Sequence, residues 1–91
     1  MRKEQSRNPI AVARGLREFG ENVQAWRKLR GLTQAQLAER AGVARVTVIR
    51  LERNEGAVSL ENTLRVLGAL GVLDQVSRAL DPYSTDLGRA R

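Results

Sequence analysis

The run TQAQLAERAGV, residues 33–43, carries the clearest signals of the fold. Thr33, followed three residues later by Gln36, has the form of a capping box, which predicts that a helix begins at Gln34. Gly42 then ends this helix after about two turns, because glycine readily takes the left-handed conformation that turns the chain sharply. The run therefore predicts one short helix and a tight turn into the next.

The residues after the turn predict a second short helix, from Arg45 to Asn54. Val48 and Leu51 stand at i and i+3 in it and mark the side that packs on a core. Ala38 supplies the small residue that is needed inside the first helix where the second one crosses it. A two-turn helix, a small residue at its centre and a glycine turn together predict a helix-turn-helix.

Apolar residues at spacings of three and four predict further helices on both sides of this pair. The preceding helix, ending near Arg30, carries a stripe of Leu16, Phe19, Val23, Trp26 and Leu29. The following helix, capped by Ser59, carries Leu60, Leu64, Leu67 and Leu70. Gly71 should break that helix, and a short last helix with Leu73, Val76 and Leu80 should stop before Asp81-Pro82. We expect Trp26 to be a core anchor.

The composition agrees with a single small all-α domain. The chain has 91 residues and only three aromatic ones, while residues that favour helices dominate it. It contains no cysteine and no histidine, which removes disulfides, thiolate and imidazole metal ligands and the commonest general base. We therefore expect no enzyme activity, no metal site and no cofactor.

Positive charge is concentrated in the first part of the chain. Residues 1–56 hold twelve Lys and Arg against six Asp and Glu, whereas residues 57–91 hold four of each, so the whole net charge of +6 lies in the first part. This division predicts a surface for a polyanion followed by a packing or assembly element. We expect a basic flexible arm over residues 1–15, a domain over 16–81 and a polar tail over 82–91.

The outward side of the second short helix presents side chains that suit the major groove of DNA. Arg45 and Arg50 match the O6 and N7 acceptors of guanine, and Val46 and Thr47 match the methyl group of thymine. Residues at the ends of the two helices are expected to hold the phosphate backbone and fix the depth of insertion. These backbone-contacting residues are Gln34, Arg53 and Asn54.

The run WRKLRGLTQAQLAERAGV, residues 26–43, followed by Thr47-Val48 and Leu51-Glu52, closely resembles the Cro/C1-type (XRE-type) helix-turn-helix family. The resemblance covers about residues 16–73. It implies a compact lambda-repressor-like bundle of four or five helices that acts as a homodimer on double-stranded DNA with a palindromic operator. It also places Gln34 among the groove-facing positions, with Arg45, Val46, Thr47 and Arg50, and places Arg53 on a backbone-facing one.

Four further positions follow from the same resemblance. Arg27 and Glu52 match a family pair that ties the first helix to the helix after the turn, and we interpret the pair as structural. Ala44 stands where the family commonly has a serine or threonine cap, so this helix should start less firmly, at a cost of about 1 kcal/mol. Val58 stands where proline is frequent. Neither departure touches a groove-facing residue.

Two functions remain open from the sequence. The first is a transcriptional regulator, most simply a repressor, that dimerises through its last helices or tail. The second is an antitoxin that neutralises a toxin protein and represses the shared operon, since residues 81–91 are similar to the tails of HipB-like members of the family. A frayed terminus is the plain alternative for that tail. The basic, polar start and the shortness of the apolar run 66–73 predict a cytoplasmic protein without a membrane segment.

Overall fold

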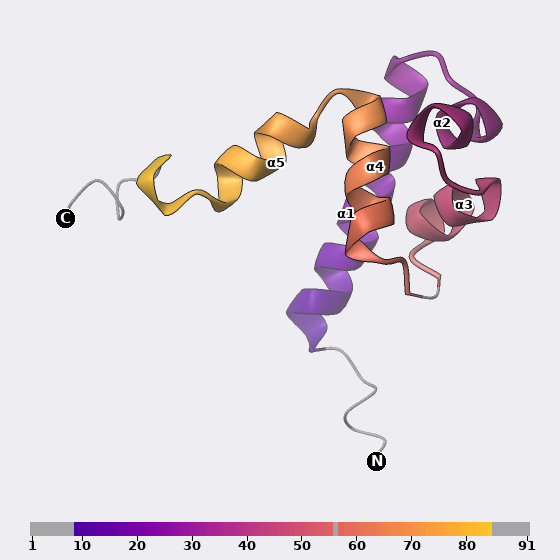
Figure 1. Ribbon diagram of the computed structural model, residues 1–91. Coiled ribbons are helices and arrows are strands. Elements are labelled where there is room, and N and C mark those ends of the chain that lie inside the picture. Colours follow the sequence, from indigo (N-terminus) through magenta and orange to yellow (C-terminus); the bar gives the residue numbers. More distant parts are fainter. Residues whose placement is uncertain (1–8, 56, 85–91) are drawn as a thin grey trace.

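All regular structure in residues 9–55 and 57–84, the part that the computed structural model describes, is helical (Figure 1). The elements are α1 (Ile10–Leu29), α2 (Gln34–Ala41), α3 (Arg45–Arg53), α4 (Leu60–Leu70), α5 (Leu73–Leu80) and a short 3-10 helix, η2 (Pro82–Ser84). The prediction of a bundle of four or five helices is confirmed. Residues 1–8 of the expected arm and 85–91 of the expected tail lie outside the described residues.

The helix α1 begins earlier than the sequence predicted. It starts at Ile10, so residues 10–15 are part of the helix and not of an arm, and Pro9 stands directly before it with a φ of −54°. The sequence prediction relied on apolar residues at helical spacing, and residues 10–15 lack that spacing. They are not buried in the structure either: Ile10 is 81% exposed and Val12 is 47% exposed. Adding turns to an existing helix requires no burial, since propagation is far easier than nucleation.

The turn between α2 and α3 has the expected geometry. The Thr33 hydroxyl accepts a hydrogen bond from the Gln36 backbone N–H at 3.0 Å, and the Gln36 side chain accepts from the Thr33 N–H at 2.9 Å. Gly42 ends α2 in the left-handed conformation, with a φ of 72°. The cap and the turn together hold α2 to eight residues.

The helix α3 begins and ends differently from α2. Ala44 precedes it without any side-chain cap, as its sequence implied. At the other end, Asn54 takes a left-handed conformation with a φ of 58° and is the one described residue other than glycine with a positive φ. Asparagine tolerates this region better than most residues. Asn54, which was predicted from the sequence to contact the DNA backbone, is therefore also the C-cap of α3.

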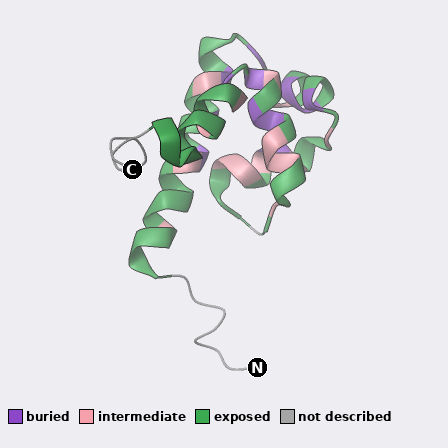
Figure 2. Ribbon diagram, turned by 60° about the vertical axis from the view of Figure 1, so that its left-hand side comes forward, coloured by how far each residue is buried: buried purple, intermediate pink, exposed green. Residues whose placement is uncertain are grey.

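The core lies where α1, α2, α3 and α4 meet (Figure 2). Its fully buried side chains are Val23, Leu37, Val48, Val66 and Leu70. Ala38 is 3% exposed, as expected for the small residue at the helix crossing. Trp26 packs against the core, which confirms it as an anchor.

The apolar stripe of α1 is narrower than predicted. Leu29 is 76% exposed, although it lies three residues after Trp26. Two successive steps of three, from Val23 to Trp26 to Leu29, rotate the side chain by about 120° around the helix, which takes Leu29 off the buried face. Arg27, one step of four from Val23, occupies that face instead and is buried.

The helix α5 leads away from the other helices in Figure 1. Gly71 separates it from α4 with a φ of 80°, and the chain leaves the helix at Asp81, as predicted. No residue of α5 is fully buried. Leu80 is 80% exposed, and Tyr83 in η2 is 71% exposed. The end of the described chain thus carries large apolar side chains that face away from the core.

Candidate nucleic-acid interface

The side chains of α3 that were predicted to contact bases lie mostly on its outward side. Arg45 and Arg50 are exposed, and Val46 is 47% exposed. Thr47 is half-buried and is less available than the other three. Val48, next in the chain, is fully buried and fixes which side of the helix faces the core. The four side chains predicted to contact bases therefore lie on one short helix, three of them open to solvent.

Positive charge continues to the end of α3. Arg53, its last residue, is exposed, as is Asn54 after it. Within residues 9–55 and 57–84, the ion pairs are Arg27 with Glu52 and Arg65 with Glu61, so none of the three exposed arginines of α3 is neutralised by one. A helix with several exposed guanidinium groups that form no ion pair is the kind of surface that attracts a polyanion.

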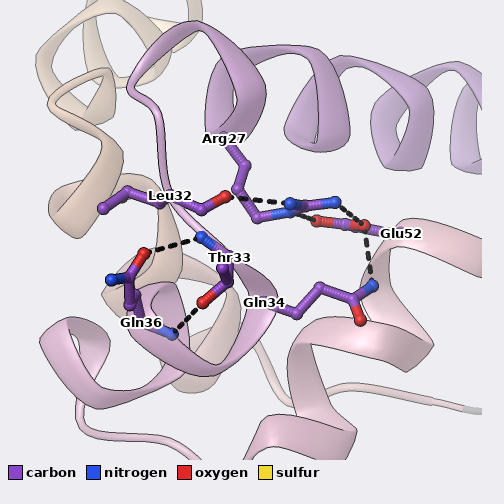
Figure 3. A network of polar contacts seen from close by, with 6 residues as sticks. All are labelled: Arg27, Leu32, Thr33, Gln34, Gln36 and Glu52. Carbon is purple, nitrogen blue, oxygen red and sulfur yellow. Dashed lines mark hydrogen bonds and ion pairs between the residues drawn. The ribbon is translucent and has the colours of Figure 1, made fainter.

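A buried polar network ties α3 to the rest of the fold (Figure 3). The Arg27 Nε donates to Glu52 Oε2 at 2.6 Å, and its Nη2 donates to Glu52 Oε1 at 3.2 Å. The third contact runs from Arg27 Nη1 to the backbone oxygen of Leu32 at 2.9 Å. The two side chains are only 11% and 2% exposed, so water does not compete for these contacts. The predicted tie between α1 and α3 is confirmed.

Gln34 belongs to the same network, which the sequence did not predict. Its Nε2 donates to Glu52 Oε1 at 3.1 Å, and the residue is half-buried at the start of α2. A carboxylate only accepts hydrogen bonds, so it is the amino side of the amide that faces Glu52. One of the two amide hydrogens of Gln34 is thus used inside the protein, and its position relative to α3 is fixed.

Two other residues that set the geometry were missed by the sequence reasoning. Gly20 is buried where α1 crosses α3: a Cβ on it would lie 2.6 Å from the backbone oxygen of Glu52 and 2.7 Å from that of Leu51. Arg30 donates from Nε to the backbone oxygen of Leu70 at 2.9 Å and lies 5.1 Å from the centre of the Trp26 ring. The one signal available in the sequence concerned Gly20, which is an isolated glycine within a helical pattern.

The described part of the chain offers neither a membrane-spanning helix nor a cluster of metal ligands. None of its helices has the length and apolar character required to cross a lipid bilayer. Among the same residues, no three acidic, histidine or cysteine side chains are grouped as a metal ion would require.

Comparison with known proteins identifies the family. A sequence profile described as helix-turn-helix matches residues 23–83, which is most of the chain. The chain belongs to the helix-turn-helix family. The match covers the last seven of the twenty residues of α1 and all of α2 to α5, including every residue that was predicted from the sequence to contact DNA.

Two curated relatives of this helix-turn-helix protein carry regulatory names. One is an immunity repressor protein of Bacillus phage phi105, 43% identical over 53 residues, which are 58% of this chain and 37% of the relative. The other is described as an uncharacterized HTH-type transcriptional regulator of Methanothermobacter thermautotrophicus, 51% identical over 45 residues, which are 50% of this chain and 65% of the relative. The similarity thus spans about a third of the first relative and just under two thirds of the second.

Proposed function

We propose that this helix-turn-helix protein is a sequence-specific DNA-binding transcriptional regulator that acts as a repressor. The observation that carries the proposal is the exposed side of α3, with Arg45, Val46 and Arg50 open to solvent and no ion pair on either arginine within the described residues. An α-helix fits the major groove, and these side chains match base edges there. Membership of the family and the regulatory names of the relatives favour this role over an enzyme.

Within this proposal the contacts are divided by what they recognise. Arg45, Val46, Thr47 and Arg50 read bases, while Arg53 and Asn54 at the end of α3 contact the phosphate backbone. Gln34 is assigned to the backbone as well, with its amide directed by Glu52. The Arg27 and Glu52 pair contacts no DNA but holds α3 against α1, and the hydrogen bond from Gln34 to Glu52 ties α2 to the same carboxylate.

We further propose that the protein acts as a homodimer on a palindromic site. The exposed Leu80 and Tyr83, on the segment that leads away from the bundle, supply apolar surface for a second copy. The two recognition helices would then meet half-sites about 34 Å apart, one turn of DNA. Sedimentation of the free protein tests the dimer. A protein that is monomeric at micromolar concentration and binds DNA as one copy per site contradicts it.

The same exposed surface is the reason to keep an antitoxin role as the second candidate. In that case Leu80 and Tyr83 would contact a toxin, and repression would accompany neutralisation. Co-expression with the product of the neighbouring gene tests this candidate. A neighbour that is not toxic and forms no complex with the protein removes it.

Selection of bound DNA from a random pool tests the main proposal. We expect a conserved half-site, repeated with inverted symmetry at a fixed spacing. A pool that stays random after several rounds, at a salt concentration where non-specific binding is weak, contradicts sequence-specific recognition.

A further inference from the structure

An open apolar groove lies beside the DNA-facing helix. It is formed where α1, α3, the connection between α3 and α4, and the start of α4 approach one another, and its volume is about 600 Å³. The apolar part of its wall consists of Leu16, Phe19, Leu51, Ala57 and Val58. Sites for small molecules typically have volumes of about 300–1,000 Å³ and walls of this mostly apolar kind.

Among the residues that the structure describes, Arg50 is the only charged one in the lining of this groove. The other polar residues there are Asn54 and Thr63, both neutral. In the described part of the chain no carboxylate forms an ion pair with Arg50, since the two pairs present involve other arginines. The groove thus combines an apolar wall with one positive charge that has no anionic partner among the described residues.

We infer that the groove binds a small amphipathic carboxylate. Its apolar or aromatic body would pack on Phe19, Leu51 and Val58, and its carboxylate would take two hydrogen bonds from the Arg50 guanidinium. A cationic ligand would be repelled by Arg50. A single negative charge balances the single positive one, so the ligand carries one carboxylate and no further charge.

Occupation of the groove has a consequence for DNA, and this part rests on the proposed function. Arg50 is assigned both to the groove and to a base contact, and its guanidinium cannot serve both at once. A bound carboxylate therefore competes with DNA for Arg50 and lowers affinity for the operator. In that role the ligand is an inducer.

Binding itself is tested without DNA, by NMR titration of the full chain with 4-phenylbutyrate and with decanoate. We expect shifts of the Phe19, Leu51 and Val58 amide signals. The uncharged 4-phenylbutan-1-ol should bind about tenfold more weakly or worse, because it loses a charge-assisted hydrogen bond. Arg50→Gln should weaken carboxylate binding to a similar extent, whereas Arg53→Gln, on the same helix but outside the groove, should leave it unchanged.

Three results of this titration overturn the inference. The first is the absence of shifts at millimolar concentrations of both carboxylates, and the second is equal affinity for the alcohol. The third is a change of the Ala57 and Val58 signals with protein concentration alone, which assigns the groove to a second copy of the chain.

The effect on DNA is tested with Ala57→Trp, which fills the groove from an exposed position outside the proposed DNA contacts. We expect saturating 4-phenylbutyrate to weaken operator binding by the unchanged protein but not by this variant, whose folding is checked by its NMR spectrum. If the carboxylate does not change the affinity of the unchanged protein for the operator, the inducer role is overturned and the proposed regulatory function stands. Failure to select any DNA, with carboxylate binding that still depends on Arg50, overturns the regulator and leaves the site intact.

Discussion

Arg27 holds both carboxylate oxygens of Glu52, at 2.6 and 3.2 Å, across the interface between α1 and α3. The same carboxylate accepts from Gln34 at the start of α2. One acidic side chain thus fixes the positions of three helices. Its replacement should affect stability first and DNA binding through the loss of that geometry.

Glu52→Gln keeps the size of the side chain and removes its charge, which leaves the buried Arg27 without its anionic partner. We expect the free energy of unfolding to fall by about 2 kcal/mol or more, measured by urea denaturation. Glu61→Gln is the matched control, because the Glu61 and Arg65 side chains are 75% and 50% exposed and their pair should contribute less than about 0.5 kcal/mol. Equal losses of unfolding free energy for the two variants would show that burial of the Arg27 and Glu52 pair adds nothing to stability.

Gly20→Ala should destabilise the protein, although alanine is the better helix former. The added methyl group would lie 2.6 and 2.7 Å from two backbone oxygens of α3, so the helices must separate, at a cost of about 1–3 kcal/mol.

Gly15→Ala is the control for this variant, in the same helix, where a Cβ meets nothing within 4 Å. It should raise stability by about 0.5–1 kcal/mol. Thermal unfolding of the two variants should therefore shift in opposite directions, and a shift in the same direction contradicts the close crossing of α1 and α3.

Much of this architecture can be predicted from short stretches of sequence. The features that could not be predicted depend on how the helices cross. The Thr33 cap and the Gly42 turn are local events, so a few neighbouring residues specify them. The importance of Gly20 and the contact from Arg30 to Leu70 arise between residues 31 or more positions apart and leave no local pattern. Leu29 was misplaced because a spacing of three, repeated, drifts around the helix.

The candidate site follows the same division. That α3 exposes Arg45 and Arg50 follows from the burial of Val48, which its apolar spacing indicated. The hydrogen bond between Gln34 and Glu52 was not predictable, because it depends on the angle between α2 and α3. The groove that contains Arg50 was missed for a similar reason, since its lining comes from α1, α3, the connection after α3 and α4.

Ala44→Ser should stabilise the protein by supplying the cap that α3 lacks. Position 44 already has an extended backbone, with φ −70° and ψ 149°, so a serine hydroxyl can reach an N–H of the first turn without rearrangement. We expect a gain of about 1 kcal/mol in the free energy of unfolding, measured in urea.

Ser59→Ala is the complementary variant, because the Ser59 hydroxyl accepts from the Asn62 N–H at 3.0 Å. Its removal should cost about 1 kcal/mol. A neutral result for Ala44→Ser beside a loss for Ser59→Ala would indicate that the start of α3 is satisfied by other means.

Arg45→Ala should separate base recognition from simple attraction to phosphate. On the selected site we expect a loss of about 1–3 kcal/mol in binding free energy and weaker discrimination among bases, with little change on random DNA. Arg50→Ala should behave in the same way.

Arg53→Ala should instead weaken binding to selected and random DNA alike, and lower the dependence of log K on log salt by about one. Fluorescence anisotropy over a range of salt concentrations measures both quantities. Equal losses on both kinds of DNA for Arg45→Ala would reassign Arg45 to a phosphate contact.

The connections between the helices are short: Arg30 to Thr33 joins α1 to α2, Gly42 to Ala44 joins α2 to α3, and Gly71 with Val72 joins α4 to α5. The helices that pack most extensively, α1 with α3 and α2 with α4, are separated in the chain by a single helix, so the loops that must close are of moderate length. Helical domains of this kind fold on a timescale of microseconds to milliseconds. A chain that opens by thermal fluctuation should close again before a protease can cut it, so its lifetime in the cell should follow its equilibrium stability more than its rate of unfolding.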